Sequence, residues 1–344
     1  MVRHALSAPL LVIALLVGDT AAHAQADPLQ AKSKADPVAA SPLRRVTVAT
    51  GDLLAAQHFY ADALGMAASR RSPLTPSEAR RLGVASGAVA MTFVRSGISD
   101  AVTVRAVSVA ARHPALRPTH NALALGGLAM GMPVSGQAKR EAIVKAAGFQ
   151  SAVGVTSMTL PRADGTSYQV EEIHYQGPDG VLVLGIDRGE MPPVGPIDAA
   201  TGIGGPAYSS IVVADLPRTE AFMQTVLRYE KRRDAVFTSS GPKGGLGLPD
   251  GQRFAFQQWF APGSATGYVI LMKMLDRPVE RPQTARFARR GIAMWTFDAV
   301  DLDDVAARAE SVGSRVVAKD ATSLIVAMPD GFLIEFVKRN GTKS

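Results

Sequence analysis

The 344-residue chain is 47% hydrophobic and 19% charged, carries a formal net charge of +7, and contains no cysteine. This is the composition of a globular protein with a substantial core, and the length suggests two domains, since a single core rarely grows past about 250 to 300 residues. The lack of cysteine excludes a disulfide framework and a thiolate metal site, so any metal would need His, Asp or Glu ligands.

The first 24 residues have the pattern of a signal peptide. A basic start precedes an apolar run from Ala8 to Gly18, and Ala22-His23-Ala24 has the A-x-A form that signal peptidase accepts. The apolar run is shorter than the roughly 20 residues that a membrane-spanning helix needs, and no later apolar run is longer. We therefore expect cleavage after Ala24, with Ala26 as the alternative, a periplasmic or secreted protein, and no membrane span.

Residues 25–42 are rich in Ala, Asp, Lys, Pro and Ser and show no apolar periodicity. Such a composition predicts a flexible tether after the signal peptide. Ordered structure is expected to begin near Leu43.

A strand followed by a helix recurs along the rest of the chain. The pattern is clear at 45–66, 208–229 and 294–313, and a weaker copy lies at 128–149. The helix starts are expected at Asp52, Ser135, Asp215 and Asp301, which are 83, 80 and 86 residues apart. A nearly constant period predicts repeated units.

Each expected helix is followed by segments rich in β-formers, so each unit has the order βαβββ. The fold class is therefore α+β, with sheets covered by helices on one face only. We expect the four units to pair in chain order, giving domains at 43–195 and 203–340 with concave mixed sheets. The stretch between Glu190 and Pro206 is rich in Gly and Pro and is the expected linker.

Three sequence features resemble the vicinal oxygen chelate superfamily, which includes glyoxalases, bleomycin-resistance proteins and extradiol dioxygenases. They are Asp52-Leu followed by His58-Phe-Tyr60 and Leu64-Gly-Met66, the parallel Asp215-Leu copy, and the ending Pro329-Asp-Gly-Phe-Leu-Ile-Glu335. With the βαβ repeats they cover nearly the whole chain after residue 42. The resemblance implies a divergent four-module member with glyoxalase-like domains.

Metal-dependent members of that superfamily carry a His or similar ligand seven residues before the helix-start Asp, and a Glu after the Pro-Asp-Gly turn. The corresponding first-strand places hold Arg45, Leu128, Tyr208 and Met294, and the last-strand places hold Leu184 and Glu335. This set departs from the two-His, one-carboxylate triad of the iron enzymes. We therefore expect no metal and no cofactor, and a pocket that persists without them.

Strand alternation places Glu335 on one face with Leu333 and Val337, which is the expected concave side. Glu335 is the candidate catalytic acid or base, or a hydrogen-bond partner for a ligand; the alternative is a carboxylate paired with a nearby Arg or Lys. Glu172 and His174 share a strand face and form a second candidate pair, either for a ligand or as a simple acid and histidine contact. Further candidates for ligand binding or cavity walls are Arg45, Tyr208, Phe256, Trp259, Met294 and Trp295.

Three functions remain open. The first is a binding module that captures a small hydrophobic or aromatic molecule in a concave pocket. The second is a lyase, isomerase or dioxygenase that uses Glu335 with non-standard ligands, and the third is a scaffold with degenerate pockets. Nucleic-acid binding is not expected, because the basic clusters at 228–233 and 277–290 have no interleaved aromatic residues for stacking.

Overall fold

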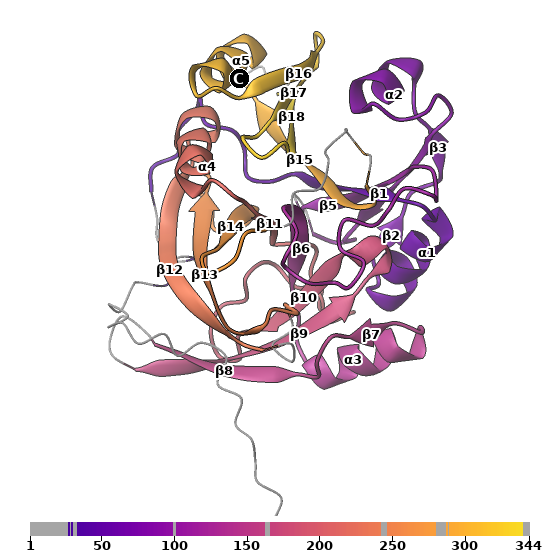
Figure 1. Ribbon diagram of the computed structural model, residues 1–344. Helices are drawn as coiled ribbons and strands as arrows, with labels where there is room; N and C mark the ends of the chain where they lie inside the picture. The colour runs from indigo at the N-terminus through magenta and orange to yellow at the C-terminus, as the bar shows by residue number, and fades with distance from the viewer. Residues whose placement is uncertain are drawn as a thin grey trace, which may run out of the picture.

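The computed structural model describes residues 27, 29, 33–98, 101–161, 166–241, 246–279, 287 and 289–339. The expected signal peptide at 1–24 lies outside the described residues. Within them, no helix has both the length and the apolar character needed to cross a bilayer. The fold is α+β, as predicted, and consists of two curled mixed sheets with helices between them (Figure 1).

The first sheet is built from the first and fourth units and has the strand order β16-β17-β18-β15-β1-β5-β4-β2, with β3 paired to β4. Its strands are β1 (Arg45–Thr50), β2 (Ala67–Ala68), β3 (Ser72–Pro73), β4 (Val89–Val94), β5 (Thr103–Ser108), β15 (Gly291–Ala299), β16 (Arg315–Lys319), β17 (Ser323–Ala327) and β18 (Leu333–Lys338). The two units meet where β1 and β15 pair in an antiparallel manner.

The second sheet is built from the second and third units and has the order β12-β13-β14-β11-β6-β10-β9-β7, with β8 paired to β9. Its strands are β6 (Gly126–Pro133), β7 (Gln150–Ser151), β8 (Thr156–Pro161), β9 (Ser167–Gln176), β10 (Leu182–Asp187), β11 (Tyr208–Val212), β12 (Glu230–Ser240), β13 (Asp250–Phe260) and β14 (Tyr268–Met274). Here the two units meet where β6 and β11 pair.

A helix follows the first strand of each unit, as predicted. These helices are α1 (Leu53–Gln57) continued by the π-helix η1 (His58–Ala63), α3 (Gln137–Ala146), α4 (Leu216–Phe222) continued by the π-helix η3 (Met223–Leu227), and α5 (Leu302–Ser311). Two further elements were not predicted: the helix α2 (Pro76–Leu82) and the 3-10 turn η2 (Pro178–Gly180). The side chains of Asp52, Asp215 and Asp301 accept hydrogen bonds from backbone N–H groups of the first turn, which confirms three of the predicted helix starts. The helix α3 begins after Gly136 and has no side-chain cap.

The pairing of units differs from the chain-order pairing that we expected. Each sheet takes one unit from 43–195 and one from 203–340, so these ranges do not correspond to separate sheets. Units that are neighbours in the chain instead contact each other through their helices, with α5 beside η3 and α3 beside η1 (Figure 1). The reason is that the βαβββ pattern defines each unit but does not specify which two first strands will pair to join two units into one sheet.

The Gly- and Pro-rich stretch after β10 is not an open linker. Its Ile203 bridges to Val134, and the Gly204 N–H donates to the Pro133 carbonyl at 2.8 Å, so the stretch runs back along the end of β6. The end of the predicted tether is also packed. Ala39, Ala40 and Ser41 are buried, and the Ser41 N–H donates to the Asp298 carbonyl at 2.9 Å, so the prediction of a flexible tether does not hold for these three residues. A segment held by backbone hydrogen bonds leaves no apolar periodicity in the sequence.

Five tyrosines give the folded chain a predictable response to high pH. Burial raises the pKa of Tyr60, Tyr175, Tyr208, Tyr229 and Tyr268 above the ordinary tyrosine value. Their stabilising contribution is complete below pH 10, where the unfolded tyrosines keep their protons, and is lost as the pH rises above 10. We expect the free energy of unfolding to fall by about 1.4 kcal/mol per tyrosine per pH unit there.

The measurement is urea unfolding at pH 8 to 11.5, with tyrosine ionisation followed by absorbance at 295 nm. Four arginines act in the opposite direction, because burial lowers the pKa of Arg95 to about 10, that of Arg117 to about 9, and also those of Arg140 and Arg308. They are outnumbered by the five tyrosines and should reduce the slope without reversing it. Constant stability from pH 9 to 11.5, or ionisation of all tyrosines before unfolding, would contradict the prediction.

Candidate binding site

The structure divides the predicted site residues between two concave faces. Arg45 and Glu335 lie together on the first sheet, whereas Tyr208, Glu172 and His174 line a cavity on the second. The catalytic and ligand-binding candidates therefore do not converge on one site, because they belong to units that enter different sheets.

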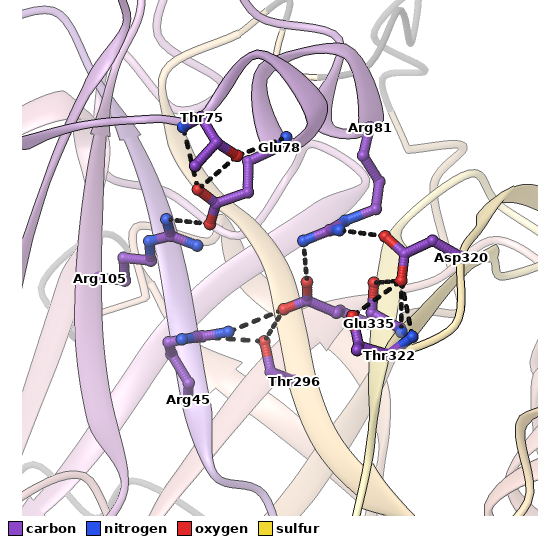
Figure 2. A network of polar contacts seen from close by, with 10 residues as sticks. Arg45, Thr75, Glu78, Arg81, Arg105, Thr296, Asp320, Thr322 and Glu335 are labelled. Carbon is purple, nitrogen blue, oxygen red and sulfur yellow. Dashed lines mark hydrogen bonds and ion pairs between the residues drawn. The ribbon is translucent and has the colours of Figure 1, made fainter.

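On the first sheet, Glu335 is the centre of a buried network of ion pairs (Figure 2). Its side chain is 2% exposed, and its Oε2 atom accepts hydrogen bonds from Arg45 Nη2 and Thr296 Oγ1, both at 2.9 Å. Its Oε1 atom lies 3.5 Å from Arg81 Nη2. The carboxylate points to the concave side, as strand alternation predicted, and it is paired with arginines, as in the alternative interpretation.

A second ion pair flanks the first in the same polar pocket of about 270 Å³. Arg105 Nη2 lies 3.1 Å from Glu78 Oε1, and Glu78 also closes a capping box with Thr75 at the start of α2 (Figure 2). Burial raises the pKa of Glu78, while hydrogen bonds from Thr75 and Arg105 lower it, and the net shift is downward. Glu78 is therefore an ionised partner for Arg105.

The rest of this concave face is filled by the α2 segment, which the sequence analysis did not predict. Leu74, Ala79 and Leu82 pack against Met294 and Leu333 in one buried apolar cluster. Met294, predicted to bind a ligand, is completely buried in this cluster and lines neither of the two cavities. Met294 lies on the first strand of the fourth unit, as predicted, but the helix α2 that covers it belongs to the first unit.

The metal that the superfamily implies does not fit the residues at its places. In the first unit, Arg105 pairs with Thr47 in the same way that Glu335 pairs with Thr296 in the fourth, so Arg105 occupies the place that corresponds to Glu335. The four ligand places of the first sheet therefore hold Arg45, Arg105, Met294 and Glu335. A guanidinium carries hydrogen-bond donors only and cannot ligate a cation. In the second sheet the places hold Leu128, Leu184 and Tyr208. Among the described residues there is no group of three or more His, Asp or Glu side chains that could hold a metal ion.

The cavity of the second sheet has a volume of about 190 Å³ and is mainly apolar and aromatic. Its walls come from eight strands of the second sheet, from loop residues such as Val153 and Val194, and from residues 27 and 29 near the start of the chain. The side chains include Leu29, Leu128, Tyr168, Val170, Leu184, Ile186, Tyr208, Phe237, Phe254, Phe256, Tyr268, Ile270 and Met272. A small apolar molecule could be largely enclosed there.

Aromatic rings form one wall of this cavity. The ring of Tyr208 stacks on that of Tyr268 with their centroids 5.0 Å apart, and Tyr268 stacks on Phe260 at 4.4 Å. Tyr208 lies across β6 at Gly131, where an added Cβ would be 2.0 Å from the ring. Glycine at this place therefore allows the tyrosine to lie flat over the strand.

A few polar groups break the apolar lining. His174 Nε2 lies 3.4 Å from Glu172 Oε2, so the predicted contact between them is present. The buried His174 Nδ1 and Gln258 Oε1 have no hydrogen-bond partner among the described residues. Unpaired buried polar atoms are costly, and in a cavity they are available to a ligand.

Two of the aromatic residues expected in cavity walls lie elsewhere. Trp259 and Trp295 are fully buried in the apolar core on the helix-covered face, whereas Phe256 does line the cavity. The sequence analysis also missed Arg188, which lines the cavity directly after β10, and Arg233, which lines it from β12. Their positions carry no motif, and only the pairing of the second and third units brings them together.

Comparison with solved structures identifies the architecture. Glyoxalase I from Zea mays superposes with a TM-score of 0.56 at 14% identity, covering 87% of this chain and 92% of that chain. A single-site variant of the same enzyme gives 0.58 with the same identity and coverage. The chain has the vicinal oxygen chelate fold. A candidate dioxygenase from Bacillus subtilis matches with a TM-score of 0.55 at 14% identity, over 90% of this chain and 87% of that chain.

No protein-family model and no curated protein matches the sequence. The fold resemblance stated from the sequence is confirmed by the structural neighbours, which share the vicinal oxygen chelate architecture over most of their length. At this low identity the likeness concerns the fold. The function must be argued from the two concave faces of this chain.

Proposed function

We propose that this chain is an exported protein of the vicinal oxygen chelate fold that binds a small hydrophobic or aromatic molecule without the superfamily's metal. The cavity of the second sheet is the binding site. The observation that carries the proposal is a concave space of about 190 Å³ lined by aromatic and aliphatic side chains, at the places where metal-dependent members carry ligands. Leu128, Leu184 and Tyr208 there suit an apolar guest.

The alternative functions have weaker support. A lyase, isomerase or dioxygenase built on Glu335 is suggested by neighbours named as enzymes, but both oxygens of this carboxylate are already engaged by Arg45, Thr296 and Arg81. Proton transfer would require an ion pair to break first. A scaffold with degenerate pockets is not favoured by the second sheet, whose apolar cavity has room for a small molecule.

Binding can be tested with indole as a neutral aromatic probe, by calorimetry and thermal shift. We expect wild-type protein to bind it, and Ser210→Phe to weaken binding at least tenfold, because the cavity-lining Ser210 is buried and a phenyl ring there occupies the guest's space. Ser311→Phe adds the same ring at the exposed last residue of α5 and should bind like wild type. Equal affinity of the two variants would refute the cavity as the site.

Metal independence and export have their own measurements. Protein purified from the periplasm should contain no stoichiometric metal by inductively coupled plasma mass spectrometry, and added Fe²⁺, Zn²⁺, Mn²⁺ or Ni²⁺ should leave its melting temperature unchanged. A stoichiometric metal that is lost in Glu335→Ala would favour the enzyme alternative. Intact mass should show a chain that begins at Gln25 or Asp27.

A further inference from the structure

The cavity of the second sheet contains an arginine whose partner carboxylate comes from the N-terminal segment. Arg188 lines the cavity directly after β10, and its side chain is only 4% exposed. Its Nη2 atom donates to Asp27 Oδ2 at 2.7 Å and to the Tyr168 hydroxyl at 3.2 Å, and its Nη1 atom donates to the Pro192 carbonyl at 2.7 Å. The guanidinium also lies over the Tyr168 ring, 5.2 Å from the centroid.

This arginine is charged in the folded protein. Burial lowers the pKa of Arg188, whereas the hydrogen bonds that it donates to Asp27 and Tyr168 raise it, and the net shift is upward. A buried guanidinium needs hydrogen-bond acceptors, and a carboxylate among them also compensates its charge, so the removal of that carboxylate would leave Arg188 at a disadvantage. The planar fork of Arg188 is suited to carboxylate recognition.

Asp27 and its neighbour Leu29 occupy the cavity in the way that a ligand would. It lines the cavity together with Leu29, whose side chain packs against the apolar cluster of this sheet, while the Leu29 N–H donates to the Asp27 carboxylate at 3.2 Å. The segment therefore supplies one carboxylate and one apolar group to the cavity. Asp27 is 161 residues away from Arg188 in the chain and lies in no helix or strand.

The balance of charge around the cavity favours an anion once Asp27 leaves. The charged side chains lining it are Asp27, Glu172, Arg188 and Arg233. Without Asp27, two arginines face one carboxylate. Glu172 is in contact with His174, so it is not the partner that Arg188 would gain.

We propose that the natural ligand is a monocarboxylate with an aromatic or apolar body, and that its carboxylate replaces Asp27 at Arg188. This inference rests on the proposed function and specifies the ligand class for the same cavity. The volume of about 190 Å³ suits one ring with a short chain. Asp27 then acts as a built-in competitor that covers the arginine when no ligand is bound.

The test compares cinnamate with its neutral analogue cinnamamide by calorimetry, using protein expressed from the full-length chain. We expect Asp27→Asn to tighten cinnamate binding about tenfold and to change cinnamamide binding less than twofold, because only the carboxylate competes with Asp27. Asp36→Asn is the matched control, since Asp36 belongs to the same segment but pairs with Arg228 outside the cavity. Its cinnamate affinity should equal that of wild type.

Arg188→Met should abolish the preference for cinnamate over cinnamamide, with circular dichroism confirming that the variant is folded. Binding of cinnamamide with no gain for cinnamate in Asp27→Asn would overturn this inference and leave the proposed function intact. If neither probe binds to wild type or to Asp27→Asn, and indole also fails, both the inference and the proposed function fall. An equal gain in Asp36→Asn would also overturn the inference, since the effect would then be one of net charge.

Discussion

Replacing Arg117 by methionine is expected to lower the free energy of unfolding by roughly 3 to 5 kcal/mol, the largest effect of any single substitution considered for this chain. Arg117 is 2% exposed, and its guanidinium donates hydrogen bonds of 2.5 to 2.9 Å to four backbone carbonyls. These carbonyls belong to Asn121, Ala124, Gly126 and Gly127. Methionine fills much of the same space but leaves all four acceptors without this donor.

The loss should be large because this loop joins the two sheets. Gly180 comes so close to the Arg117 carbonyl that an added Cβ would lie 2.1 Å from its oxygen. Gly127 is equally close to β15, since a Cβ there would lie 2.4 Å from the Ile292 carbonyl oxygen. The contact between β6 and β15 therefore depends on a loop whose shape Arg117 fixes. Without the guanidinium, water or a distorted loop must satisfy the carbonyls.

Urea unfolding at pH 7 measures the effect, with Arg112→Met as the control. Arg112 is exposed five residues earlier in the same loop, so its replacement should change stability by less than about 0.5 kcal/mol. If Arg117→Met loses less than 1 kcal/mol, the carbonyls have other partners, and the argument for a fixed loop fails.

The elements that the sequence predicted best were those with local causes. Asp52, Asp215 and Asp301 each cap a helix through their own side chains, and the repeat could be seen because these caps recur. Alternation along β18 correctly placed Glu335 on the concave face, since the period of a strand is a property of the backbone. Such features need only a few neighbouring residues.

The features that the sequence did not predict depend on distant partners. The choice of β15 as the neighbour of β1 joins residues about 250 positions apart, and no local pattern expresses it. The α2 segment buries Met294 from another unit, and Asp27 reaches Arg188 from a segment without periodicity. The candidate site was therefore split: its individual residues were found, but the assembly of each cavity was not.

The second large effect is expected at Glu335, where Glu335→Gln should lower the free energy of unfolding by about 3 kcal/mol. The substitution keeps the shape of the side chain but removes the charge that faces Arg45 and Arg81, whose side chains are 26% and 15% exposed. Two half-buried guanidinium groups would then be left with less compensation. Glu310→Gln, at an exposed place on α5, is the control and should be nearly neutral.

The sign of this change separates the two leading functions. A carboxylate held for catalysis is commonly a strained or uncompensated group, and its neutralisation tends to stabilise the protein. A carboxylate that stands at a former metal-ligand place but forms ion pairs with arginines stabilises the fold. In that case Glu335→Gln should lower the free energy of unfolding. A double-mutant cycle with Arg45→Met should give a coupling energy of about 1 kcal/mol or more, because both substitutions remove the same 2.9 Å contact. If Glu335→Gln were more stable than wild type and showed no coupling, the result would favour an enzyme whose active site is on the first sheet. The cavity of the second sheet would then not be the main functional site.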